Sequence, residues 1–552
     1  MLSAMVLREL TTLLRRRRMM ALQCGLVVLF AVLVALRWPT DARVALTGSR
    51  SQQVFQLFAY GLLATLLLLL PVFPATSIVR EKIQGTLALL LNTPLGPVRI
   101  FFGKLVAVLA FAGIILAMSL PAASACYAMG GLSLVNDVGK VYQLLTLVAI
   151  QFAVLGLLIS SYASSIDSAV RVTYGIVLCL CILSLGPHYF FQGTKGTFAD
   201  VGALLRGFSP FAVMLSLTGA GDFGSQGLVK QTDLLGQFTV SSLIVSFVAA
   251  VWTMSRLNHT IFDKARAAGN ISDDQTGSVQ YFRRLFFLVD PQRRSRGISA
   301  FVNPVMMKEF RCRRFGRLHW LLRLVSFCAI LSLALTYATT AGTFSWGVET
   351  IGGIMVVMQV ALVVLVTPSM SAGLLSSERE SQGWQLLQAT PMSITRIVWG
   401  KLLSVLLPLM LILCATLPGY LIMVYIEPGM EQQVKRVVIC LAATAVFAML
   451  LSAAVGSLFS QTAPATAGAY GILLSICALP LLVWMGRDAP FGHKTVETAL
   501  TINPIAAALS VIRMPGFQNY SLIPANWWIL GIGSVISLVV LLSQTYRISR
   551  PK

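Results

Sequence analysis

A polar stretch with the sequence EKIQGTLALLLNTP at residues 81–94 recurs as ERESQGWQLLQATP at residues 378–391. The first copy is followed by RIFFGKL at residues 99–105 and the second by RIVWGKL at residues 396–402. Long apolar runs flank both copies. Because charged side chains are costly inside hydrocarbon, each copy, here called an island, is predicted to be a loop between two membrane spans.

The composition is that of a membrane protein. Hydrophobic residues make up 57% of the 552 residues, charged residues only 11%, and the mean hydropathy is +0.80. A soluble domain carries about 25% charged residues. The apolar runs reach the length needed to cross a hydrocarbon core of ~30 Å. We therefore predict an all-α polytopic membrane protein with short cytoplasmic amphipathic helices.

The formal net charge of +22 is explained by topology, not by nucleic-acid binding. Basic residues gather at one set of span ends, and cytoplasmic loops of membrane proteins are enriched in Lys and Arg. From Arg256 to Arg323 the chain has fourteen basic and five acidic residues, so this central segment is predicted to be cytoplasmic. An even number of spans in each half then places both termini and both islands on the cytoplasmic side.

About twelve spans are expected, six in each half, and the order of landmarks repeats. Pro71 and Pro368 lie 297 residues apart, as do Lys104 and Lys401. We interpret this as a tandem duplication of two parallel repeats. The predicted spans lie at roughly 19–37, 54–78, 104–129, 141–163, 170–188, 235–256, 320–341, 350–374, 401–426, 436–459, 465–486 and 525–546. The predicted domains are a first six-span repeat at 1–257, a cytoplasmic linker at 258–302 and a second repeat at 303–552.

The longest outer loops contain amphipathic stretches, one from Phe198 to Leu217 and one from Val496 to Ile512. Each stretch is expected either to lie in the membrane interface or to dip back into the membrane. In the second case its backbone needs hydrogen-bond partners inside the protein.

The sequence contains no catalytic or metal-binding constellation. The Gly-Lys pairs that end at Lys104 and Lys401 resemble the end of a phosphate-binding loop, but they lack its first Gly and its Ser or Thr. No C-x-x-C pair occurs and the four His lie outside the spans, so no metal or cofactor is expected in this chain. Lys104 and Lys401 are expected to snorkel at the start of a span. The spans carry no ionisable residue near their centres, which argues against an ion-coupled transporter.

Each island combines charged residues, a Gly, a Leu-rich piece and Thr-Pro. The Gly permits a sharp turn, and Thr-Pro disfavours helix before the next span. The expected result is a short helix across the membrane surface, with Leu89 and Leu90, or Leu386 and Leu387, packed down. The charged residues Glu81 and Lys82, and likewise Glu378 and Glu380, are expected to be free for a cytoplasmic partner. The candidate docking residues are Glu81, Lys82, Gly85, Thr86, Leu89, Glu378, Arg379, Glu380, Gly383 and Leu386.

A basic helix precedes the first span of each half. The first is expected near residues 5–18, along the cytoplasmic surface, where its basic side chains face anionic lipid. The second begins at Asn303-Pro304 and mirrors it at an offset of 300 residues. The candidate residues of these two helices are Arg8, Glu9, Arg15, Lys308, Glu309 and Arg311.

The ordered set of motifs resembles the membrane subunits of type-2 ABC exporters. The first island matches their pattern of a charged cluster, Gly-Thr, a Leu-rich run, Thr-Pro-Leu and Gly-Lys, whereas the second departs from it at Trp384 and Met392. The resemblance implies that the islands are coupling helices for a separate ATP-binding subunit, in two copies, and that the basic helices are connecting helices. It further implies that ATP and Mg are bound on that subunit, that this chain is not itself an enzyme, and that it lies in a bacterial inner membrane. A second permease or a periplasmic component is a further partner to consider.

Two other classes of protein remain open. One is an ion-coupled secondary transporter with six-plus-six repeats, which typically carries a Gly-rich basic motif between spans two and three that this chain lacks. The other is a non-transporting scaffold or signalling module coupled to an ATPase. The transported substrate stays undetermined, because lipid, polysaccharide, peptide and drug are all exported by proteins like this.

Overall fold

The computed structural model is helical, with no strand in the part of the chain that it describes. That part comprises residues 6–11, 17–35, 49–93, 96–163, 165–181, 183–185, 188, 197–218, 233–257, 303–312, 326, 329–330, 348–485 and 493–549. The linker predicted at 258–302, Arg15 and all of the span predicted at 320–341 except residues 326, 329 and 330 lie outside the described residues. We call the described residues up to 257 the first half and those from 303 onward the second half.

The first half follows the predicted order of spans. A short helix at 6–11 precedes α2 (Arg17–Ala35), and α3 (Ser49–Leu69) and α4 (Val72–Ile83) form one span with a break at Leu70 and Pro71. The remaining elements are α5 (Thr86–Leu91), α6 (Pro97–Ala128), η1 (Leu134–Gly139), α7 (Lys140–Tyr162), α8 (Ile166–Cys181), η2 (Leu183–Leu185), α10 (Thr197–Arg206), α11 (Pro210–Leu217) and α12 (Leu234–Arg256).

The second half repeats this order. It begins with α15 (Pro304–Cys312), and α17 (Val348–Ser371) leads into α18 (Gly373–Glu380) and the short α19 (Gly383–Gln388). The remaining elements are α20 (Ile394–Ile426), η4 (Pro428–Met430), α21 (Glu431–Ser457), α22 (Thr462–Met485), α23 (His493–Leu500), α24 (Pro504–Ile512) and α25 (Ala525–Ser549).

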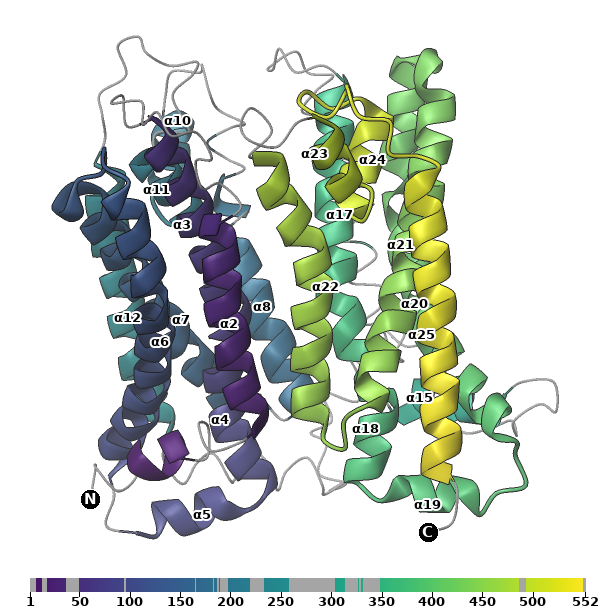
Figure 1. Cartoon of the computed structure of the whole chain (residues 1–552). Coiled ribbons are helices and arrows are strands. Elements are labelled where there is room, and N and C mark those ends of the chain that lie inside the picture. Colours follow the sequence, from purple (N-terminus) through teal and green to yellow (C-terminus); the bar gives the residue numbers. More distant parts are fainter. Residues whose placement is uncertain are drawn as a thin grey trace.

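Nine helices among the described residues are long and apolar enough to cross a membrane, or up to eleven if two bent pairs are each counted as one span. This confirms the prediction of an all-α polytopic membrane protein. The bent pairs are the two amphipathic stretches of the outer loops. The axes of α10 and α11 differ by 82°, and those of α23 and α24 by 112°. Both pairs lie at the end of the bundle opposite α5 and α19 (Figure 1).

Each bent pair is tied at its corner to the fifth span of its own half. The Ser209 hydroxyl donates to the carbonyl of Cys181 at 2.7 Å, and the Asn503 amide donates to the carbonyl of Cys477 at 2.8 Å. These bonds supply the internal partners that a broken backbone needs. The corner contacts recur 294 and 296 residues apart.

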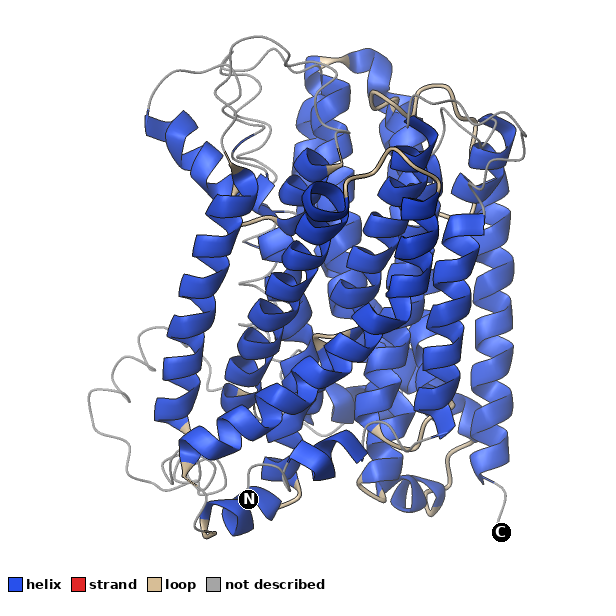
Figure 2. Ribbon diagram, turned by 60° about the vertical axis from the view of Figure 1, so that its left-hand side comes forward, coloured by secondary structure: helices blue, strands red, loops and turns tan. Residues whose placement is uncertain are grey.

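The described part of the chain is a bundle of helices (Figure 2), in which the two halves stand side by side and meet along helices from their second and fifth spans (Figure 1). The contacts run from α3 and α8 of the first half to α17 and α22 of the second, and we call this boundary the seam. Within each half, the fourth span packs closely on the second: a Cβ at Gly156 would collide with Pro74, and one at Gly456 would overlap the backbone of Ala372.

Candidate functional site

The first island folds into a sharp corner followed by one and a half turns of helix. Gly85 has a φ of 73°, in the left-handed region, so the predicted role of this Gly as a turn residue is confirmed. In α5, Leu87 and Leu90 are buried, whereas Leu89 is 69% exposed. The expectation that Leu89 packs down is therefore wrong. A helix of this length buries only one face, and Leu89 lies on the other.

The second island has the same shape with a different turn residue. Gln382, not Gly383, has the positive φ, at 58°. Gly383 is needed instead for space, because a Cβ there would collide with the carboxylate of Glu378. In α19, Trp384 and Leu387 are buried and Leu386 is 76% exposed. Leu386 therefore also points outward, which corrects the same expectation in this half.

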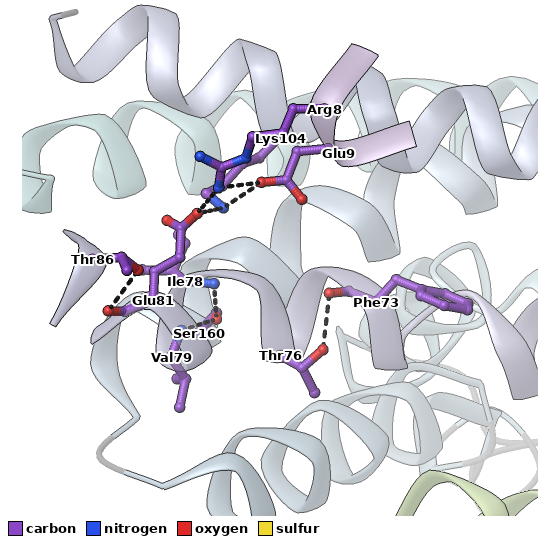
Figure 3. Close-up of polar contacts among 10 residues, drawn as sticks. All are labelled: Arg8, Glu9, Phe73, Thr76, Ile78, Val79, Glu81, Thr86, Lys104 and Ser160. Atoms are coloured by element: carbon purple, nitrogen blue, oxygen red, sulfur yellow. Dashed lines mark hydrogen bonds and ion pairs between the residues drawn. The ribbon is translucent and has the colours of Figure 1, made fainter. Parts of the chain in front are cut away.

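The first island is anchored by a buried group of charges (Figure 3). The ammonium group of Lys104, at the start of α6, lies 3.1 Å from Glu81 Oε1 and 3.3 Å from Glu9 Oε1. Arg8 Nη2 approaches Glu81 Oε1 at 3.1 Å from the solvent side. Glu81 is only 6% exposed, so it is not free for a partner, and Lys104 does not snorkel.

The same group of charges recurs in the second half. Lys401 Nζ, in α20, lies 2.7 Å from Glu309 Oε1 and 3.0 Å from Glu378 Oε1, and Lys308 reaches Glu378 at 3.0 Å. Lys401 is 2% exposed. The expectations for this half are therefore also wrong: Glu378 is not free for a partner, and Lys401 does not snorkel to the membrane surface. We call these two sets of charges the anchor networks.

The remaining island residues also have structural roles. The amide of Thr462 donates to Glu380 at 2.9 Å, and Arg379 donates to the carbonyl of Phe459 at 3.2 Å, so Glu380 is not free either. Thr86 donates to the carbonyl of Glu81 at 3.3 Å, and Lys82 is half-buried. Arg311 lies on α15.

Each anchor network joins three elements that are distant in sequence. A surface helix (6–11 or α15) and the end of a second span each contribute a carboxylate to one buried lysine at the start of a third span. A buried charge is costly unless it is paired, and removing one partner leaves the others unpaired. The networks therefore hold the surface helix, the island and the third span as one unit.

The networks could have been found in the sequence only as a recurrence. The Gly-Lys pairs and the Glu of the basic helices repeat at offsets of 297 and 300 residues, but nothing local shows that they meet. Among the described residues, no group of three His, Cys, Asp or Glu is placed to hold a metal ion.

The described residues thus form a multi-pass bundle with two short surface helices, α5 and α19, each anchored at the same end of the membrane spans. Residues 12–185, which include α2 to α8, match the model of a family described as ABC-2 family transporter protein. No curated protein matches the chain. Over these residues, the match confirms the resemblance to ABC-2 type permeases that the motifs indicated.

Proposed function

We propose that this chain is the membrane subunit of an ATP-driven export system and that α5 and α19 dock onto separate ATP-binding subunits. The observation that carries the proposal is the pair of outward-facing leucines, Leu89 and Leu386. They occupy equivalent positions, 297 residues apart, on two short helices at the same end of the bundle (Figure 1).

The anchoring supports a mechanical role for these helices. A surface loop that only connects two spans has no need of a buried lysine shared by two carboxylates. An element that transmits a movement of a bound partner to the spans does need a rigid attachment to them. In each half the anchor network joins the island to the third span through Lys104 or Lys401.

The two matched helices suggest two copies of the ATP-binding subunit. ATP and Mg would be held by that subunit, since the island sequences lack the features of a phosphate-binding loop. The basic residues at this end of the bundle favour placing this end, and the ATP-binding subunit, in the cytoplasm. The resemblance to type-2 ABC exporters supports placing the chain in a bacterial inner membrane.

Docking is tested with the double variant Leu89→Glu/Leu386→Glu. The chain is co-expressed with each ABC-type ATP-binding subunit of its own genome, and binding is measured by pull-down in detergent. We expect the unaltered chain to retain one such subunit and the double variant to lose it by more than about tenfold, because a charge replaces each apolar contact. The folded state should persist, since both side chains are exposed.

The matched control is Leu134→Glu, because Leu134 is 59% exposed and follows the C-terminal end of α6, whereas the island precedes the N-terminal end of that helix. It should leave binding unchanged. Equal binding by the double variant and the control would refute docking through α5 and α19. ATP hydrolysis by the purified chain alone would refute the division into two subunits, and substrate-stimulated hydrolysis by the complex would separate export from a purely structural scaffold.

A further inference from the structure

Two cations lie close together where the first island begins, and neither is paired with an acid. Arg256, the last residue of α12, acts electrostatically on Lys82, near the end of α4, and both side chains are half-buried. In the part of the chain that the structure describes, neither forms an ion pair with a carboxylate. Glu81, next to Lys82, is instead paired with Lys104 and Arg8. Like charges repel strongly in such a place, so the pair of cations lacks a counterion.

The guanidinium group of Arg256 is folded over the protein instead of extending into water. It lies 4.1 Å from the centroid of the Tyr162 ring, at the end of α7, and its Nε is buried without a hydrogen-bond partner. The Tyr162 ring meets the Trp252 ring edge-on, with centroids 6.0 Å apart and an angle of 85° between the rings. A cation that only marks the end of a span keeps its charge hydrated by snorkelling. Here the ring holds the charge in a fixed place.

An apolar face of α12 leads directly to the two cations. Phe247, Val248 and Val251 are exposed on this face, and Trp252, which is 52% exposed, lies one turn before Arg256. Because α12 is long and apolar enough to cross a membrane, these side chains face hydrocarbon. Trp and Tyr are typical of the level at which hydrocarbon meets the lipid headgroups. The cations are therefore placed at headgroup level, at the end of a track for acyl chains.

The sixth span of the second half lacks this cation. Thr253 in α12 and Thr545 in α25 are both buried, and each donates to the carbonyl four residues earlier. The two helices therefore align at an offset of 292 residues. At this offset Ile548 stands at the position of Arg256.

The other two positions differ between the halves as well. Leu458 stands at the position of Tyr162, 296 residues later, so no ring is available to hold a guanidinium group there. Arg379 corresponds to Lys82, but it donates to the carbonyl of Phe459 at 3.2 Å. The unpaired cations beside an aromatic ring are thus a feature of the first half and not of the repeat.

We propose that the ends of α4, α7 and α12 form a binding site for one anionic phospholipid. Lys82 and Arg256 bind its phosphate group, because charge-assisted hydrogen bonds to phosphate are strong, and Tyr162 positions the guanidinium group. The acyl chains lie along the outward face of α12. A zwitterionic headgroup would bring a further cation to a place that already holds two. The site does not depend on the docking of ATP-binding subunits.

The test is native mass spectrometry of the purified full chain in detergent, with dioleoyl phosphatidic acid and dioleoyl phosphatidylcholine as probes. We expect one phosphatidic acid molecule to bind at least about tenfold more tightly than phosphatidylcholine, and Lys82→Gln/Arg256→Gln to lose this preference. Tyr162→Leu should weaken binding of phosphatidic acid by about threefold, since the contact between ring and cation is lost. The matched control is Arg547→Gln, which removes an exposed cation from the last turn of α25 and should leave this affinity unchanged.

Two further measurements use the unaltered chain. Glycerol 3-phosphate carries the phosphate group without acyl chains, and in large excess it should not displace the lipid. Displacement would assign the site to a soluble phosphate and overturn the proposal. Phosphatidic acid with a photoreactive diazirine in one acyl chain should label residues 240–256 several times more than the aligned residues 532–548. Equal labelling of the two segments would refute the site, as would equal affinities of Lys82→Gln/Arg256→Gln and Arg547→Gln for phosphatidic acid.

Discussion

Lys401 is buried between two carboxylates, and this single residue fixes where three elements meet. In Lys401→Met the carboxylates of Glu309 and Glu378 remain buried near each other and lose their shared cation. We expect a loss of about 3–5 kcal/mol of stability, the cost of breaking one partner out of a buried group of charges. Thermal unfolding in detergent measures it.

Lys435→Met is the matched control for that change. Lys435 pairs with Glu431 on the surface of α21, where both side chains are exposed to water. Exposed pairs of this kind contribute little, so the unfolding midpoint should stay where it is. Equal shifts in the two variants would show that Lys401 is not the buried centre of its network.

At the residue scale, the sequence singled out the charged residues of the islands correctly, but it did not predict their surroundings. Glu81 and Glu378 were expected to be free, because charged loop residues usually face water. Both are buried, because their partners come from other elements: Arg8 and Lys104 for Glu81, and Lys308 and Lys401 for Glu378. The separation of 95 residues between Glu9 and Lys104 is invisible to any local pattern. Gly85 was predicted correctly because a left-handed turn is a local property.

At the scale of elements, the closest approach joins the fourth span to the second. Gly456, in α21, lies against the backbone of Ala372, at the junction of α17 and α18. Gly456→Ala should destabilise the second half by about 1–3 kcal/mol, because a methyl group cannot enter without moving one helix. Thermal unfolding of the purified chain tests this.

Gly471→Ala provides the comparison, since a Cβ at Gly471 in α22 meets nothing within 4 Å. There the substitution should be neutral or stabilise by about 0.5–1 kcal/mol, through the higher helix propensity of Ala. If Gly456→Ala and Gly471→Ala have the same unfolding temperature, α21 and the α17–α18 junction are not in contact.

The spans themselves were predictable, because an apolar run of sufficient length has few alternatives to a membrane helix. The bends were not. The corners between α10 and α11 and between α23 and α24 depend on bonds from Ser209 and Asn503 to the fifth spans, which are contacts of the folded state. For this reason the sequence alone did not decide whether the two amphipathic stretches lie in the membrane interface or dip back into the membrane.

For the whole molecule, the two short helices α5 and α19 and the residues directly next to them carry no charged side chain. Neither residues 83–95 nor residues 381–395 contain an acidic or basic residue. We therefore expect binding of the ATP-binding subunit to change by less than about twofold when the ionic strength rises from roughly 0.05 M to 0.5 M, because screening acts on exposed charges. Affinity measured in detergent over this range is the check. A steep fall with salt would place the contact on other, charged residues.

The seam is not symmetrical. Arg171 crosses it from the first half, whereas Ala467 stands at the position that corresponds to it, 296 residues later, in the second. Two identical halves brought together would carry a guanidinium group from each side into the same weakly solvated boundary, and like charges repel strongly there. Linking both halves in one polypeptide lets the first half carry this guanidinium group without a second one opposite it, so that the two sides of the boundary can differ.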